Sequence, residues 1–145
     1  MTLEQKVLEA KEVIKTALAK HGNKVYLAYS GGKDSQAVLK LAKSVRQDII
    51  VIHNEHEGED IKEKNGVLVV KKPKTQVPKF LEMVKLEAQI DGTRKDEDDM
   101  VVVDGELIHR SKLQSAHIIN GLFGLEVYLP LLNFTEEEVY DYLQK

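Results

Sequence analysis

Apolar residues near the start of the chain recur at the spacing of one face of an α-helix. The residues that share this face are Leu3, Val7, Ala10, Ile14 and Ala17. Thr2 and Gln5 have the spacing of a capping box, and the pair His21-Gly22 is a typical helix end. The pattern therefore predicts an amphipathic helix that runs from the capping box to His21.

Uninterrupted apolar runs follow, and such runs are typical of strands that are buried on both faces of a parallel sheet. They read "VYLAY" at 25–29, "IIVIH" at 49–53 and "VLVV" at 67–70, and a shorter run lies at 88–90. Two further helices are expected between these strands. One covers roughly Val77 to Leu86, and the other has a single apolar face made of Ala37, Val38, Leu41 and Ala42.

The last third of the chain contains a hairpin signal and a second helix start. "MVVVDGELIH" at 100–109 places apolar arms around Asp104-Gly105, a pair that favours a two-residue hairpin turn. "VYLPLL" at 127–132 predicts another strand. Thr135 and Glu138 then have capping-box spacing, which predicts a final helix to about Leu143.

Strands that alternate with helices predict an α/β fold, with three layers (α/β/α) around a mostly parallel sheet. The chain has 145 residues, which favours one domain over residues 1–145. No apolar run approaches the roughly 20 residues of a membrane span, and the N-terminal segment does not read as a signal peptide. We therefore expect a cytoplasmic protein without a membrane partner.

Charge and cysteine content narrow the chemistry. Lys and Arg number 21 against 24 Asp and Glu, and a net charge of −3 argues against a general nucleic-acid binder. The sequence contains no cysteine, so a thiol, a thiolate metal centre or a cysteine nucleophile is not expected. The negative net charge and the absence of cysteine both argue against an enzyme that thiolates RNA.

The segment "YSGGKDSQ" at 29–36 is the candidate for binding an anion. It joins a predicted strand to a predicted helix, at the sheet edge where ligands of open α/β sheets bind. Gly31 and Gly32 allow close approach of the backbone, the helix N-terminus attracts negative charge, and Lys33 adds a cation. A plain strand-to-helix turn is the alternative, but hydroxyls on both sides of the glycines favour a phosphate site. The spacing matches neither a Walker loop nor GxGxxG.

Ser-Gly-Gly-Lys-Asp-Ser after a buried strand resembles the PP-loop of the N-type ATP pyrophosphatases. This adenine nucleotide α-hydrolase-like family includes PAPS (phosphoadenosine phosphosulfate) reductases, the small subunit of ATP sulfurylase and certain FAD synthetases. "DGTRKDED" at 91–98 is similar to the family's Gly-x-Arg-x-x-Glu segment, and residues 127–143 look like its closing segment. The resemblance implies a HUP-type, Rossmann-like fold that binds a nucleotide by its phosphates and supports chemistry at the α-phosphate.

The resemblance also implies which residues form the site. Lys33 and Arg94 would be catalytic, since they would neutralise the leaving pyrophosphate, and Mg²⁺ would accompany the nucleotide, with Asp34 as its candidate ligand. The adenine would lie beside Ala28, Tyr29, His53 and Asn54. The full set of expected phosphate-binding residues is Ser30, Gly31, Gly32, Lys33, Asp34, Ser35, Gly92 and Arg94.

Two departures from the family pattern qualify this implication. PAPS reductases work through a cysteine in a C-terminal tail, which these residues lack, so we expect adenylyl transfer with pyrophosphate release by a PAPS reductase-like protein without the reductase cysteine. The arginine that often follows the Gly-x-Arg-x-x-Glu segment is replaced by the apolar residues 100–103. Arg110 and Lys112 are both open as its substitute.

A second class of function stays open. The chain is alternatively a non-catalytic nucleotide-binding module, as a homo-oligomer or as a subunit of a larger enzyme. In either case the partner is an adenine nucleotide, and the sequence does not name the acceptor. "HNEHEGED" at 53–60 is interpreted as a polar loop rather than a metal site, and "KKPK" at 71–74 as a solvated loop rather than a nucleic-acid patch.

Overall fold

The computed structural model describes residues 1–53, 62–64, 67–71 and 85–145. The helices and strands of these residues are α1 (Leu3–His21), η1 (Gly22–Lys24), β1 (Val25–Tyr29), α2 (Lys33–Val45), β2 (Ile50–His53), β3 (Lys62–Lys64), β4 (Val67–Lys71), β5 (Ala88–Ile90), β6 (Met100–Val103), β7 (Glu106–His109), η3 (Arg110–Lys112), β8 (His117–Ile118), η4 (Leu122–Gly124), β9 (Glu126–Tyr128) and α4 (Glu136–Leu143).

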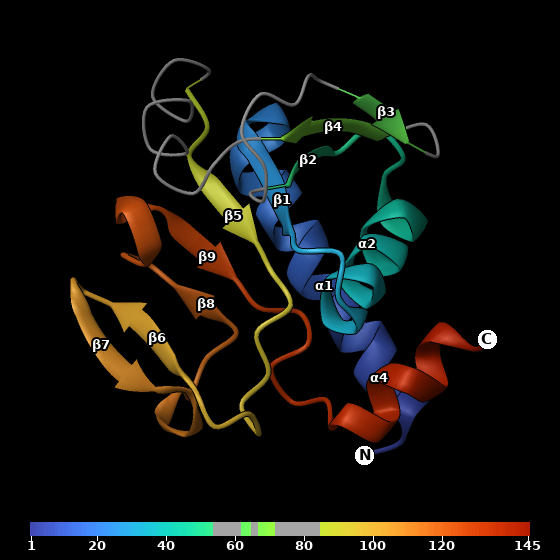
Figure 1. Cartoon of the computed structure of the whole chain (residues 1–145), viewed down its shortest axis with the longest axis vertical. Helices are drawn as coiled ribbons and strands as arrows, with labels where there is room; N and C mark the ends of the chain where they lie inside the picture. Colours follow the sequence, from blue (N-terminus) through green and yellow to red (C-terminus); the bar gives the residue numbers. More distant parts are fainter. Residues whose placement is uncertain (54–61, 65–66, 72–84) are drawn as a thin grey trace.

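A mostly parallel sheet forms the centre of the molecule (Figure 1). Its strand order is β3-β4-β2-β1-β5-β9-β8, in which the five inner strands are parallel and the edge strands β3 and β8 are antiparallel to their neighbours. Strands β1 and β5 are hydrogen-bonded neighbours, so the loops that follow them meet at the same edge. The predicted fold class, a mostly parallel sheet with flanking helices, is confirmed.

Helices α1, α2 and α4 pack together on one face of the sheet. Ile14 of α1, Leu41 of α2 and Val139 of α4 are fully buried there against Leu27 of β1. Each of α1 and α4 begins at the capping box that the sequence predicts, because the reciprocal hydrogen bonds at Thr2 and at Thr135 are both present. The helical faces predicted from spacing are therefore the ones that the core buries.

The opposite face of the sheet carries two smaller apolar clusters. One contains Tyr26, Ile52, Leu86 and Leu125, and the other lies beneath the hairpin of β6 and β7. The hairpin turns at Asp104-Gly105, where both residues have positive φ (52° and 79°), as a turn that matches the twist of the strands requires. The predicted hairpin is confirmed.

The structure differs from the sequence prediction mainly at short or irregular elements. Strands β3 and β8, of three and two residues, were not expected. The run at 127–132 is a strand only to Tyr128, after which it enters turns. The helix expected over 77–86 lies outside the described residues except for Lys85 and Leu86. These two are not helical, and Lys85 has a φ of 57°, so the predicted end of that helix is wrong.

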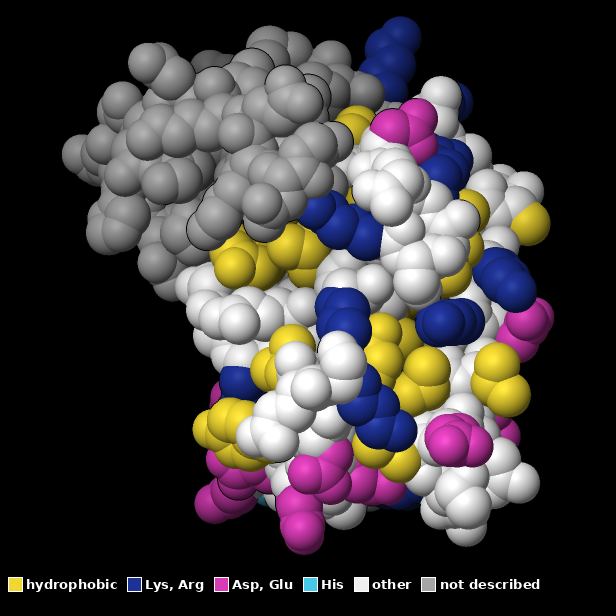
Figure 2. Space-filling model, turned by 90° about the vertical axis from the view of Figure 1, so that its right-hand side faces the viewer, with side chains coloured by type: hydrophobic (Ala, Val, Ile, Leu, Met, Phe, Trp, Pro, Cys, Tyr) yellow, Lys and Arg dark blue, Asp and Glu magenta, His cyan; other side chains and the backbone are white. Residues whose placement is uncertain are grey.

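Charged side chains are spread over the face on the side of α2 and α4 (Figure 2). Lys and Arg side chains are separated there by polar and apolar surface, and acidic side chains gather toward the lower part of the view. The described residues of this face do not concentrate the positive charge that a nucleic-acid surface needs. In the described part of the chain, no helix has both the length and the apolar character needed to cross a membrane. The predicted cytoplasmic location stays a prediction.

Candidate functional site

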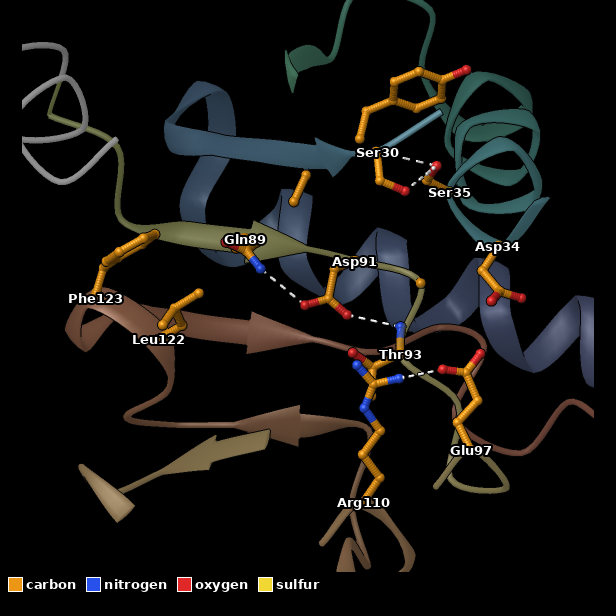
Figure 3. Close-up of a pocket in the computed structure, with 13 residues that line it drawn as sticks. Ser30, Asp34, Ser35, Gln89, Asp91, Thr93, Glu97, Arg110, Leu122 and Phe123 are labelled. Atoms are coloured by element: carbon orange, nitrogen blue, oxygen red, sulfur yellow. Dashed lines mark hydrogen bonds and ion pairs between the residues drawn. The ribbon is translucent and has the colours of Figure 1, made fainter. Parts of the chain in front are cut away.

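A cleft of about 440 Å³ opens where the loops after β1 and β5 meet (Figure 3). One wall comes from the loop after β1 and the start of α2, through Ser30, Asp34 and Ser35. The opposite wall comes from the segment after β5. Arg110, which follows the hairpin, and the η4 turn at Leu122 and Phe123 close the remaining side. The cleft therefore lies where an open α/β sheet is expected to bind its ligand.

The loop after β1 is shaped by glycine and serine. Gly31 has a φ of 87°, which a residue with a side chain rarely adopts. The Ser35 hydroxyl accepts hydrogen bonds from the N–H groups of Ser30 (3.3 Å) and Gly31 (3.1 Å) and donates to the Gly32 carbonyl (3.0 Å). Helix α2 begins at Gly32 without a side-chain cap. Its first N–H groups therefore remain available to an anion.

The two glycines of this loop are not equivalent. Gly32 has a φ of −76°, and a β-carbon placed there would meet only the Ser30 hydroxyl, at 3.6 Å. Only Gly31 adopts a backbone angle that favours glycine. At Gly32 neither the backbone angle nor the surrounding space requires glycine.

The segment after β5 packs directly on this loop. A β-carbon at Gly92 would lie 3.0 Å from both the carbonyl carbon and the β-carbon of Asp34, so a side chain fits there only if Asp34 moves by a few tenths of an ångström. Asp91 accepts hydrogen bonds from the Thr93 N–H and from the Gln89 amide, both at 2.9 Å. Tyr26 in turn donates to Gln89. The two motifs that the sequence paired are thus in contact, and Asp91 is fixed by its own hydrogen bonds.

Arg94 lies behind the cleft wall. The side chain is almost completely buried, and the residue is 3% exposed. Its guanidinium contacts Asp34 at 3.1 Å, Asp96 at 3.2 Å and Glu97 at 2.7 Å. As the structure stands, Arg94 therefore holds the carboxylates of the wall in place and does not line the cleft.

Arg110 lines the cleft, whereas Lys112 does not. Nη1 of Arg110 lies 2.6 Å from Oε2 of Glu97, while Arg94 binds Oε1 of the same carboxylate. Glu97 thus joins two arginines through its two oxygens. Of the two residues that the sequence left open for the second arginine of the site, Arg110 is the one that the fold brings there.

Asp34 and Glu97 both contact the guanidinium of Arg94. Burial and the contact with Glu97 raise the pKa of Asp34, despite the nearby charges of Arg94 and Lys33. Burial acts to raise the pKa of Glu97 as well, but hydrogen bonds from Arg94 and Asp34 bring it below its usual value. Oδ1 of Asp34 and Nε of Arg94 are buried and, although 3.1 Å apart, are not aligned as a hydrogen bond. Buried polar atoms are usually satisfied, so this cluster is incomplete.

Lys33 does not line the cleft. Its ammonium lies 3.5 Å from Asp34 and 3.7 Å from Glu136 of α4, and 5.8 Å from the centre of the Tyr140 ring. Of the residues expected on the adenine side, Ala28 and Tyr29 line the cleft. The side chain of His53 and all of Asn54 lie outside the described residues.

Sequence reasoning missed several residues that line the cleft. They are Gln89, Asp91, Thr93, Leu122 and Phe123. The polar ones lie within or just before the recognised Gly-x-Arg segment, so their position was a usable signal. Leu122 and Phe123 carried no signal beyond the glycines on either side of them, because their placement depends on a turn in which Phe123 has a φ of 60°.

No protein-family model matches the sequence, and a search of curated proteins finds no match. Comparison of the structure with solved structures does establish the fold. This fold is shared with an FMN adenylyltransferase, a FAD synthetase and a PAPS reductase, which are among its structural neighbours.

Three of these neighbours show how far the likeness extends. Candida glabrata FMN adenylyltransferase in complex with FAD and inorganic pyrophosphate has a TM-score of 0.70 at 15% identity, over 97% of this chain and 58% of that one. Yeast FAD synthetase in complex with FAD gives 0.62 at 15% identity, over 99% and 60%. PAPS reductase from Candida auris, as a phosphate complex, gives 0.57 at 13% identity, over 94% and 78%. The chain thus spans somewhat more than half the length of the first two.

Proposed function

We propose that the chain binds ATP or a related adenylyl nucleotide in this cleft and supports adenylyl transfer with release of pyrophosphate. The observation that carries the proposal is the packing of Gly92 on Asp34, which joins the two phosphate-binding motifs into one wall. The neighbours add support, since one of them was solved with FAD and pyrophosphate together.

The nucleotide phosphates lie, in this proposal, at the N-terminus of α2. The uncapped N–H groups of its first turn and the hydroxyls of Ser30 and Ser35 orient the β- and γ-phosphates. Arg110 faces them directly, and Arg94 contributes positive charge from behind the wall. Lys33 reaches them by a rotation of its long side chain away from Glu136. These groups stabilise the charge that develops on the leaving pyrophosphate.

The cleft fits a nucleotide that carries Mg²⁺. Asp34, Asp91 and Glu97 line it together with one arginine, so a bare triphosphate would meet an excess of negative charge. The adjacent carboxyls of Asp34 and Glu97 suit Mg²⁺, which prefers one or two carboxylates together with phosphate oxygens. Within the described residues, no group of three or more side chains is arranged to hold a metal ion, so we place the ion with the nucleotide. When bound, Mg²⁺ supplies further neutralisation of the phosphates.

The adenine is placed at the end of β1, against Ala28 and Tyr29, with His53 and Asn54 following the neighbouring strand β2. The parallel pairing of Tyr29 with His53 brings the ends of these strands together. A base stacked there would leave the triphosphate directed toward the N-terminus of α2.

A non-catalytic nucleotide-binding module or a subunit of a larger enzyme is the second candidate. It is favoured by one observation, namely that neither Lys33 nor Arg94, the two residues expected to be catalytic, lines the cleft. The two candidates differ in turnover and not in the nucleotide site.

Calorimetry with Mg·ATP and an assay of pyrophosphate release separate these possibilities. We expect micromolar to millimolar binding of Mg·ATP, and pyrophosphate release that depends on an acceptor. FMN is the first acceptor to test, because a structural neighbour adenylylates it. Binding without release for any acceptor would favour the module, and an absence of binding would contradict both candidates.

A further inference from the structure

Asp91 lines the nucleotide cleft, and both oxygens of its carboxylate are held by hydrogen bonds. Oδ1 accepts from the Thr93 N–H, which is the bond of an ordinary turn. Oδ2 accepts from the side-chain amide of Gln89, at 2.9 Å, and the turn does not require this second bond. Asp91 is therefore fixed more firmly than its place in a loop explains.

The amide of Gln89 is itself fixed from the core. Gln89 is 5% exposed, and the hydroxyl of the buried Tyr26 donates a hydrogen bond to its Oε1, so that Nε2 faces Asp91 (Figure 3). Tyr26 belongs to the apolar cluster with Ile52 and Leu125. Polar groups are costly in such surroundings unless each has a partner, and a fully bonded chain of them is rigid. The chain from Tyr26 to Asp91 thus holds one carboxylate rigidly at the cleft.

The carboxylate of Asp91 keeps acceptor capacity. Each carboxylate oxygen can accept two hydrogen bonds, and the described residues supply one to each oxygen of Asp91. An ionised carboxylate has no proton to donate. It therefore favours a ligand group that donates hydrogen bonds and disfavours a ligand group with negative charge.

The strand register places Asp91 beside the expected position of the nucleoside. Leu27 of β1 pairs with Ile90 of β5, so the next residues of these parallel strands, Ala28 and Asp91, are neighbours. Both line the cleft. In the proposed function the adenine lies against Ala28 and the phosphates lie at the N-terminus of α2. The ribose joins the two, so its hydroxyl groups come to the part of the cleft that Asp91 lines.

The charges of the cleft wall leave Asp91 without compensation from the described lining residues. Among these residues, Arg110 is the only cation, and it lies 2.6 Å from Glu97. In the proposed function, Mg²⁺ and the phosphates of the nucleotide lie at Asp34 and Glu97. A further phosphate on the ribose would instead meet the carboxylate of Asp91, and like charges at close range repel strongly in a partly buried site.

We propose that Asp91 determines which adenylyl nucleotide the cleft accepts. It accepts hydrogen bonds from the ribose hydroxyls, and it excludes nucleotides that carry a phosphate on the ribose, as PAPS does on its 3′ oxygen. This inference rests on the proposed function, because it takes the nucleotide to lie in the cleft. It narrows the substrate class to adenylyl nucleotides with an unmodified ribose.

The first test compares ligands on the wild-type protein by titration calorimetry in one Mg²⁺ buffer. Adenosine 5′-phosphosulfate differs from PAPS only by the absence of the 3′-phosphate, and it should bind at least about tenfold more tightly. Of 2′-deoxy-ATP and 3′-deoxy-ATP, at least one should bind about fivefold or more weakly than ATP, because a donor to Asp91 is lost. PAPS affinity equal to that of adenosine 5′-phosphosulfate, or no loss for either deoxynucleotide, would overturn the inference.

Matched variants assign the preference to Asp91. Asp91→Asn removes the charge and keeps the shape, and the Gln89 amide can turn over to meet it because the Tyr26 hydroxyl can also accept a hydrogen bond. Asp98→Asn removes the same charge from a fully exposed side chain. Asp98 lines neither the cleft nor the second cavity of the molecule, which has about 330 Å³ and lies against the β6–β7 hairpin.

Asp91→Asn should reduce the preference for adenosine 5′-phosphosulfate over PAPS to about threefold or less, while Asp98→Asn should keep it within about twofold of the wild-type value. Circular dichroism checks that both variants are folded. An equal preference in the two variants, with Mg·ATP still bound, would overturn the role of Asp91 and leave the proposed function standing. A wild-type protein that binds none of these nucleotides would contradict the proposed function, and this inference with it.

Discussion

Two glutamates at opposite ends of the same sheet organise charge in different ways. At the amino end of β9, Glu126 contacts Lys20 at 2.6 Å, His117 at 2.8 Å and His21 at 3.1 Å. Beyond the carboxyl end of β5, Glu97 contacts Arg94 at 2.7 Å and Arg110 at 2.6 Å. In composition, the first cluster, with two histidines, is the one that suggests a catalytic or metal site.

The pKa shifts and the hydrogen bonds of the two clusters instead favour the Glu97 cluster as the functional site. A hydrogen bond from Lys20 is the main cause that lowers the pKa of Glu126, as expected of a carboxylate whose partners are all in place. Beside Glu97, by contrast, burial raises the pKa of Asp34, and one of its oxygens lacks a hydrogen bond. Glu97 also lines a cleft, whereas Glu126 lines neither cavity. The candidate site is therefore identified by a buried carboxyl group that lacks a hydrogen-bond partner beside a cleft. The types of residue in the cluster do not identify it.

The largest effect is expected at the contact between the two motifs. In Gly92→Ala the new methyl group would lie 3.0 Å from Asp34, so the walls of the cleft must separate. We expect calorimetry to show a loss of Mg·ATP affinity of at least a hundredfold in a folded protein. Gly22→Ala, at the other end of the sheet, is the control. There φ is 58° with open space around it, so stability should fall by about 1 kcal/mol without a change in affinity.

The two glutamates themselves give the next comparison. Glu97→Gln weakens the anchor of both arginines, and we expect Mg·ATP affinity to fall by roughly ten- to a hundredfold, as for the loss of charge-assisted contacts. Glu126→Gln should lower the midpoint of urea unfolding and leave that affinity within twofold. If Glu126→Gln lost as much Mg·ATP affinity as Glu97→Gln, the proposal that only the Glu97 cluster serves nucleotide binding would be contradicted.

Acid should reveal the role of Glu126 in stability. Its pKa in the folded protein is below the ordinary 4.5, so the folded state favours the ionised form. This contribution is present above the unfolded-state pKa and is lost as the pH falls through the folded-state value. Urea unfolding of the wild type should therefore lose more stability below about pH 4.5 than that of Glu126→Gln. Parallel curves for the two proteins would show that Glu126 is not coupled to folding.

The smallest effect is expected at Lys33. Its contact with Glu136, whose side chain is 60% exposed, is a surface ion pair at 3.7 Å and is worth less than about 1 kcal/mol. Glu136→Gln should release the lysine and raise Mg·ATP affinity by up to about fivefold, while adenosine affinity stays the same. A decrease in Mg·ATP affinity would mean that Glu136, and not Lys33, faces the nucleotide.

The sequence predicted the features that depend on neighbouring residues, and it did not predict those that depend on contacts between distant segments. Local signals placed the capping boxes at Thr2 and Thr135 and the hairpin turn at Asp104-Gly105, because each depends on neighbouring residues only. The glycine-containing loop lies between β1 and the start of α2, as the sequence predicted, for the same reason. Side-chain direction was beyond the sequence, since Arg94 turns toward three carboxylates that are brought together by the fold. Arg110 reaches the cleft only because the hairpin folds back over the sheet.

A structure of the protein with Mg²⁺ and a non-hydrolysable ATP analogue is the most direct test of the central claim. The account predicts that the β- and γ-phosphates lie within hydrogen-bond distance of the N–H groups of residues 31–35 and that Arg110 contacts the polyphosphate. Asp34 should then have a partner for the oxygen that now lacks one. A nucleotide bound with its phosphates away from the N-terminus of α2 would contradict the account.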